Sequence, residues 1–128
     1  MFHARQILIV EDEFLIAMDL ADAVMALDGM VLGPVASVRE ALETLDHEEI
    51  AGAILDASLT DRDITPVALR LAGSGIPLVV HSATGLPLAV SAQWPGLPFL
   101  RKPATAQAVA ERLLLEIEKK MDRSKLHS

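Results

Sequence analysis

At 128 residues, the chain can bury a substantial core in one domain but is too short for a second. Its hydrophobic content of 52% excludes a disordered chain, and the absence of cysteine excludes a disulfide framework and a thiolate metal site. The net charge of −7 argues against direct binding to nucleic acid, and no apolar run is long enough to enter a membrane, so a cytoplasmic location is expected.

The first third of the chain predicts two strands with a helix between them. Residues 6–10 are rich in β-branched side chains and predict the first strand. Residues 13–27 predict a helix, because apolar side chains recur every three or four positions on one face. Residues 30–35 predict a weaker strand, which we place at the edge of the sheet because Gly33 and Pro34 interrupt it.

The middle of the chain continues this alternation. Ser37, followed three residues later by Glu40, forms a capping-box pattern that opens a second helix, ending near residue 46. Residues 51–55 are apolar and predict the third strand, and residues 65–72 predict the third helix.

The last third predicts two more strands, over residues 76–81 and 97–100. Between them, prolines leave room for only about two helical turns near residues 88–93, so the fourth helix should be short or irregular. The final helix is predicted over residues 105–121, with apolar side chains at four-residue spacing.

Five strand–helix repeats predict an α/β fold of the flavodoxin-like type, with a doubly wound parallel sheet and helices on both faces. Right-handed crossovers with one reversal of direction allow the strand order 2-1-3-4-5, which is the order we expect. We expect a single domain over residues 1–128, with a folded core over 5–121 and a C-terminal tail over 122–128.

Four of these predicted strands end in charged or hydroxyl side chains. Parallel strands bring their carboxyl ends to one edge of the sheet, and the switch point of this strand order lies between the first and third strands. That edge is expected to hold three acids, a hydroxyl and an ammonium, from Glu11, Asp12, Asp56, Ser82 and Lys102.

These groups suit one kind of chemistry. Three carboxylates repel one another, so such a cluster persists mainly when a cation neutralises it. Hard oxygen ligands without His or Cys favour Mg²⁺, or Mn²⁺ in its place. A carboxylate nucleophile at Asp56, beside this cation, the Lys102 ammonium and the Ser82 hydroxyl, suits phosphoryl transfer onto Asp56.

The same residues carry a resemblance to a known family. Residues 7–13, 54–56, 82–83 and 100–103 resemble, in order, the signature positions of the receiver domain of bacterial two-component response regulators. Residues 33–42 also resemble a subgroup of these receivers. Each motif is weak by itself, but four in order at the ends of four predicted strands are specific.

The resemblance assigns the metal site and the reacting group. It implies that Asp56 is the phosphoacceptor, that Asp12 binds Mg²⁺ directly, and that Glu11 binds it directly or through water. It also implies that Ser58 contributes its backbone carbonyl to the metal.

The resemblance also assigns the switch residues. It implies that Lys102 binds the phosphoryl group, that Ser82 is the switch hydroxyl, and that Phe99 is the switch aromatic residue. From the residues alone, Ser82 could be a plain turn former and Phe99 a core residue. The family expectation for the Lys102–Pro103 bond is cis, whereas the sequence alone favours trans.

The partners implied by the resemblance are proteins. A histidine kinase or a histidine phosphotransfer protein would donate the phosphoryl group, and the surface of the fourth helix, fifth strand and fifth helix would then change for a downstream protein target. We expect a stand-alone receiver, a monomer or weak dimer, because no output module follows the last predicted helix. It would assist its own phosphorylation and dephosphorylation without being a conventional enzyme.

The sequence departs from the family pattern at two places. Thr60 stands where the family usually has Pro, and the Gly common further along this loop is absent, so we expect a less rigid loop after Asp56. Residues 84–96 are short and contain prolines where the family has its fourth helix.

Two other functions fit parts of the sequence. Residues 56–60 superficially resemble the opening of haloacid-dehalogenase-type phosphatases, which form an aspartyl phosphate. That chemistry needs a second acid two residues after the nucleophile, and Ser58 cannot supply it. A receiver-like module that binds partners without being phosphorylated is the other alternative, and the intact set of acids, Ser82 and Lys102 argues against it.

Overall fold

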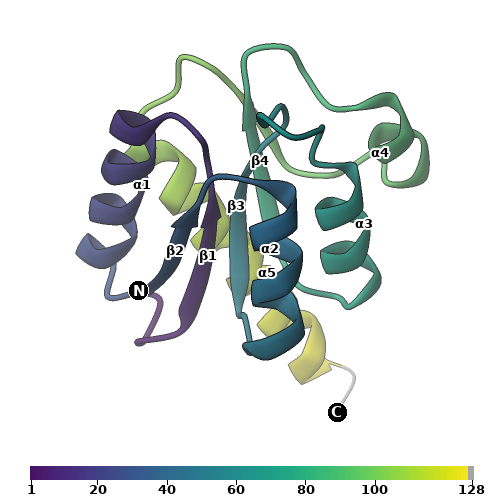
Figure 1. The fold of residues 1–128 in the computed structure, drawn as a ribbon. Coiled ribbons are helices and arrows are strands. Elements are labelled where there is room, and N and C mark those ends of the chain that lie inside the picture. Colours follow the sequence, from purple (N-terminus) through teal and green to yellow (C-terminus); the bar gives the residue numbers. More distant parts are fainter. Residues whose placement is uncertain (127–128) are drawn as a thin grey trace.

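The computed structural model describes residues 1–126, which form a five-stranded sheet between two layers of helices (Figure 1). All neighbouring strands are parallel, and their order, β2-β1-β3-β4-β5, confirms the prediction. The strands are β1 (Gln6–Val10), β2 (Met30–Val35), β3 (Gly52–Asp56), β4 (Leu78–Ser82) and β5 (Phe99–Arg101). The helices are α1 (Phe14–Ala26), α2 (Val38–His47), α3 (Thr65–Gly73), α4 (Leu88–Gln93) and α5 (Ala106–Leu126).

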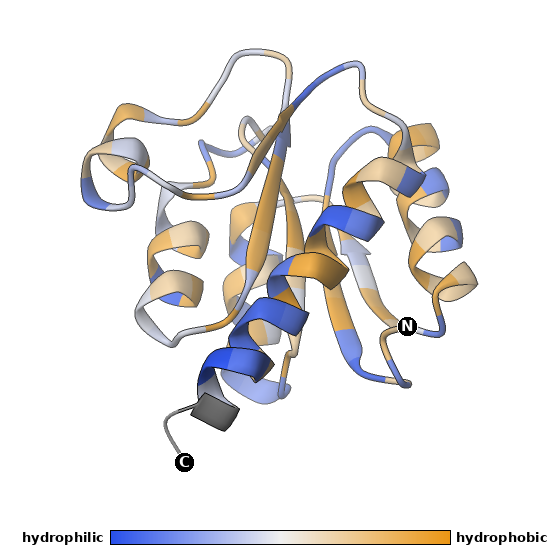
Figure 2. Ribbon diagram, turned by 180° about the vertical axis from the view of Figure 1, so that it is seen from behind, coloured by the Kyte–Doolittle hydropathy of each residue, from blue (hydrophilic) through white to orange (hydrophobic). Residues whose placement is uncertain are grey.

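The two faces of the sheet support separate layers of core. On β1, Ile7 and Ile9 pack toward α1 and α5, whereas Leu8 and Val10 pack toward α2 and α3. This alternation follows from the two-residue period of a strand. All five residues of β3 are buried, because this strand lies at the centre of the sheet with helices on both sides. Figure 2 shows the apolar strands behind α5, whose last turns are hydrophilic.

Several element boundaries differ from the sequence prediction. β4 begins at Leu78 and β5 at Phe99, each two residues later than predicted. In both places the prediction included a proline, and a proline has no N–H for a sheet.

α5 continues to Leu126, so residues 122–126 of the predicted tail are helical, and only the part over 127–128 lies outside the described residues. The apolar periodicity ends near Met121, but the residues after it still have ordinary helix propensity.

The fourth helix and the edge strand agree with the prediction. α4 is a short helix over Leu88–Gln93, and β2 lies at the edge of the sheet. The pairing of β1 with β2 shifts register where Gly33 and Pro34 interrupt β2. Gly33 has a φ of +93°, a conformation that suits glycine, and its bond to Pro34 is cis.

The start of α2 has the N-cap bond of the predicted capping box and a second, longer-range cap. The Ser37 hydroxyl accepts a hydrogen bond from the backbone N–H of Glu40 at 3.1 Å. The two preceding N–H groups, of Val38 and Arg39, donate to the carboxylate of Asp61 at 3.0 and 3.2 Å. Asp61 lies in the loop between β3 and α3, so this loop is tied to the first turn of α2.

The N-terminal segment is part of the core. Phe2 is fully buried and packs with residues of α1 and β1. Its backbone N–H donates to the carbonyl of Leu27 at 2.7 Å, and the N–H of Ala4 donates to the carbonyl of Asp28 at 2.7 Å. The segment therefore closes the C-terminal end of α1. Within residues 1–126, no helix is both long enough and apolar enough to cross a bilayer.

Candidate phosphoryl and metal site

Three carboxylates meet where β1 and β3 end side by side. Val10 pairs with Leu55, so Glu11 and Asp12, which follow β1, lie next to Asp56 at the end of β3. One carboxylate oxygen from each of these acids lies within 4.8 Å of the others. The strand order thus brings the predicted acids together.

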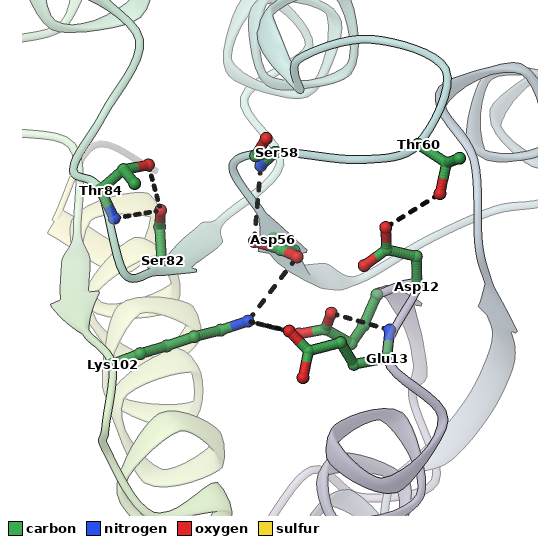
Figure 3. A network of polar contacts seen from close by, with 9 residues as sticks. Asp12, Glu13, Asp56, Ser58, Thr60, Ser82, Thr84 and Lys102 are labelled. Atoms are coloured by element: carbon green, nitrogen blue, oxygen red, sulfur yellow. Dashed lines mark hydrogen bonds and ion pairs between the residues drawn. The ribbon is translucent and has the colours of Figure 1, made fainter.

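The ammonium of Lys102 joins this cluster from the loop after β5. Its Nζ lies 3.2 Å from Oε1 of Glu11, 3.6 Å from Oδ2 of Asp56 and 3.9 Å from Oε1 of Glu13 (Figure 3). The backbone N–H of Lys102 donates to the carbonyl of Ser82 at 2.9 Å, which holds the loop against the end of β4. The Lys102–Pro103 bond is cis, as the family resemblance implies, and the trans expectation from the sequence alone is wrong.

Burial and crowding of charge change the acid–base properties of the cluster. Burial, reinforced by the hydrogen bond with Asp56, raises the pKa of Glu11 from 4.5 to about 7. Burial alone would lower the pKa of Lys102, but its hydrogen bond to Glu11 and the charges of Glu11, Asp56 and Glu13 raise it. Lys102 therefore stays charged, and one ammonium faces more carboxylates than it can neutralise.

The loop after Asp56 is closed by hydrogen bonds within it. Ser58 and Asp63 form an isolated antiparallel bridge, and the N–H of Ile64 donates to the carbonyl of Ala57 at 3.0 Å. The N–H of Ser58 donates to Oδ1 of Asp56 at 3.4 Å. Ser58 thus lies directly beside the predicted phosphoacceptor.

Thr60, which the sequence marks only as a departure, contacts the acid cluster. Its hydroxyl donates to Oδ2 of Asp12 at 3.0 Å (Figure 3). Glu13, also without an assigned role, approaches Lys102, and its N–H donates to Oε2 of Glu11 at 3.2 Å. The position of Glu13 directly after Glu11 and Asp12 was a signal for its involvement. For Thr60 no local signal exists, because Asp12 lies 48 residues away.

Ser82 lies at the end of β4, but its hydroxyl is engaged elsewhere. It accepts a hydrogen bond from the N–H of Thr84 at 3.1 Å and lies 3.3 Å from the Thr84 hydroxyl. Figure 3 shows this pair to one side of Asp56. The Ser82 hydroxyl therefore lies near the cluster without a hydrogen bond to the side chain of Asp56 or Lys102.

Phe99 and His81 lie beside the cluster rather than in it. Phe99 is half-buried on β5 and packs against the core under α3 and α4. The Arg101 guanidinium lies over its ring, 5.8 Å from the ring centre. His81 is buried on β4, and among the described residues neither ring nitrogen has a hydrogen-bond partner. Burial, with the nearby charge of Lys102, lowers the pKa of His81.

The donor set fits a hard divalent cation. The three clustered acids offer only carboxylate oxygens, which Mg²⁺ and Mn²⁺ prefer, and the sequence contains no cysteine to favour a softer metal. Burial, together with the hydrogen bond and the charge of Asp56, raises the pKa of Glu11, and a bound cation would favour its charged form. Glu11, Asp12 and Asp56 are the residues that would hold it.

No family model matches the sequence, and no curated protein matches it. Among solved structures, SdrG from Sphingomonas melonis Fr1 is 37% identical, with a TM-score of 0.75, and the match covers 92% of this chain and 99% of SdrG.

Two more distant structures share the fold. A CheY-like response regulator receiver domain protein from Methanospirillum hungatei JF-1 is 18% identical with a TM-score of 0.81, covering 93% of this chain and 98% of that one. The receiver domain of sensor histidine kinase PA1611 from Pseudomonas aeruginosa PAO1 is 20% identical with a TM-score of 0.74, covering 90% of this chain and 98% of that one. The latter was solved with a magnesium ion coordinated in its active-site cleft.

Proposed function

Because this chain belongs to the receiver-domain family of response regulators, we propose that it accepts a phosphoryl group on Asp56 in a two-component phosphorelay. The observation that carries the proposal is the convergence of three carboxylates within 4.8 Å, with the Lys102 ammonium 3.6 Å from Asp56. A carboxylate that serves only as a turn former needs neither neighbour.

The reaction is a transfer from phosphohistidine of a histidine kinase or phosphotransfer protein. A bond forms between a carboxylate oxygen of Asp56 and phosphorus while the phosphorus–nitrogen bond breaks. The imidazole leaves with the electron pair and takes up a proton. Lys102 stabilises the negative charge of the transferred group, because its raised pKa keeps it protonated.

The metal site would take Mg²⁺, held by Glu11, Asp12 and Asp56 with the backbone carbonyl of Ser58. When bound, the cation supplies charge stabilisation for the phosphoryl oxygens. The protein residues supply the orientation: Ser58 hydrogen-bonds Asp56, and Lys102 contacts both Glu11 and Asp56.

The output is a change of surface. The Ser82 hydroxyl would leave its hydrogen-bond partner Thr84 and bond to a phosphoryl oxygen instead. The half-buried Phe99, which lies beneath Arg101, would then repack. The surface of α4, β5 and α5 would then bind a downstream protein target in the cytoplasm. This role is that of a receiver that assists its own phosphorylation and dephosphorylation.

The experiment that tests the proposal is adduct formation with a small phosphodonor. Incubation with Mg²⁺ and acetyl phosphate should add one phosphoryl group, detected by intact-protein mass spectrometry, and beryllofluoride should bind at the same site. Both should require Mg²⁺ and be lost in Asp56→Asn. Asp63→Asn is the matched control, because Asp63 is an exposed acid of the same loop and should leave the adduct intact.

The alternatives predict different results. An aspartyl-phosphate phosphatase would release inorganic phosphate from phosphomonoesters with steady turnover. A receiver-like module that only binds partners would form no adduct under any of these conditions. Either result would overturn the proposed function.

A further inference from the structure

The orientation of Asp12 is set from outside the acid cluster. One of its oxygens, Oδ2, accepts the hydrogen bond of the Thr60 hydroxyl at 3.0 Å. Figure 3 shows the other oxygen of Asp12 pointing toward Asp56, into the space between the carboxylates. The Thr60 bond therefore occupies the oxygen that faces away from the cluster and leaves the other oxygen free for a ligand.

Thr60 itself is held by its neighbours in the loop. The next residue, Asp61, accepts two backbone N–H groups from the first turn of α2. The two residues that flank Thr60 and Asp61 are also hydrogen-bonded to each other: the N–H of Leu59 donates to the carbonyl of Arg62 at 3.3 Å and closes the turn. A hydroxyl at position 60 is thus positioned by a closed turn that is attached to a helix.

We propose that Thr60 is a positioning residue for the metal site, which fixes the Asp12 carboxylate so that one oxygen faces the cation. This inference rests on the proposed function, because it assumes that the clustered acids bind a divalent cation. A carboxylate surrounded by other carboxylates turns away from them unless something holds it, and the Thr60 hydroxyl does so. Loss of such an outer hydrogen bond weakens metal binding through the ligand and leaves the ligand itself in place.

The test compares three variants by their Mg²⁺ affinity without any phosphodonor. Thr60→Val removes the hydroxyl and keeps the shape, whereas Thr60→Ser keeps the hydroxyl. Thr44→Val is the matched control, because within residues 1–126 the Thr44 hydroxyl bonds only to the backbone of its own helix, at the carbonyl of Glu40. The dissociation constant is measured from the amide NMR shifts of Glu13 and Ser58 during titration with MgCl₂, and the melting temperature is measured without metal.

The expected result is a selective loss of affinity. Thr60→Val should raise the Mg²⁺ dissociation constant about tenfold, the lower end of the range for outer hydrogen-bond partners, because Thr60 is exposed. Thr60→Ser and Thr44→Val should bind as the wild type does, and the metal-free melting temperature should hardly change in Thr60→Val.

Several outcomes would overturn the inference. Wild-type affinity in Thr60→Val, or an equal loss in Thr60→Ser, would show that the hydroxyl does not position Asp12. If Thr60→Val failed to fold, Thr60→Ala would take its place with the same expected loss. Failure of the wild type to bind Mg²⁺ would instead overturn the proposed metal site, so the two failures are distinguishable.

Discussion

Lys102 faces more negative charge than it carries. Its ammonium contacts Glu11, Asp56 and Glu13, and Asp12 lies within the same cluster. Glu11 is the acid most affected, because it is almost fully buried. This burial, together with the neighbouring Asp56, raises its pKa to about 7. The site is thus electrostatically strained until a cation or a proton enters it.

A first prediction concerns the pH dependence of metal-free stability. The unfolded chain releases the Glu11 proton near 4.5, whereas the folded protein keeps it to about 7, so stability falls as pH rises through this window and stays lower above it. The loss is on the order of 3 kcal/mol. Glu11→Gln has no carboxyl group to titrate at this position, so it should not show this loss. The variant should be more stable than the wild type near pH 8 and about equally stable near pH 4.

Urea unfolding without metal at several pH values measures this difference. Parallel stability profiles for the wild type and Glu11→Gln would contradict the prediction.

At the scale of elements, loops rather than helices connect the parts of the site. The β3–α3 loop contacts Asp12 through Thr60 and α2 through Asp61, while the β5–α5 loop brings in Lys102. The N-terminal segment plays a similar part at the opposite end of α1, where Phe2 fills the core between α1 and the sheet. Short irregular segments therefore carry long-range contacts in this protein.

A second prediction follows for the N-terminal segment. Phe2→Ala should destabilise the fold by about 3–5 kcal/mol, because it leaves a cavity in the core and removes a fully buried ring. Phe14→Ala is the matched control, since the Phe14 ring is 72% exposed and should cost little. Chemical denaturation of both variants checks the difference, and similar losses in the two would refute it.

The sequence predicts the fold well and the site in part. Apolar runs such as Ile7–Val10 and the capping pair Ser37–Glu40 are local signals that fix the type of each element, and the handedness of the crossovers then limits the strand order. The strand order places the ends of β3 and β5 on the same edge of the sheet, and the loop after β5 then brings Lys102 to Asp56. Phe2, by contrast, lies in no periodic pattern, and the bond from Thr60 to Asp12 depends on the path of a loop, which composition does not specify.

At the scale of the whole molecule, the site brings together residues that follow the first and the last strands in the sequence. Glu11 and Asp12 directly follow the first strand and Lys102 directly follows the last, while Asp56 ends the third strand. A ligand that bridges these residues binds only the folded protein, so it must stabilise the entire domain.

A third prediction uses this linkage. Mg²⁺ at about 100 times its dissociation constant should stabilise the wild type by about 2.7 kcal/mol. Asp12→Asn should lose most of this gain, yet be as stable as the wild type or more stable without metal, because it removes one of the repelling carboxylates. Thermal unfolding with and without MgCl₂ measures both effects. A marked loss of metal-free stability in Asp12→Asn would show that the acid serves the fold instead.

The burial of Phe2 also governs how this domain can be joined to another protein. The backbone hydrogen bonds of Phe2 and Ala4 and the fully buried ring of Phe2 fix the path of residues 2–4. A fluorescent reporter or affinity tag fused before Phe2 would be attached beside the C-terminal end of α1, with no flexible segment of the domain between the tag and the folded core. Such a fusion would report the orientation of the domain faithfully, provided that its linker leaves the ring in place.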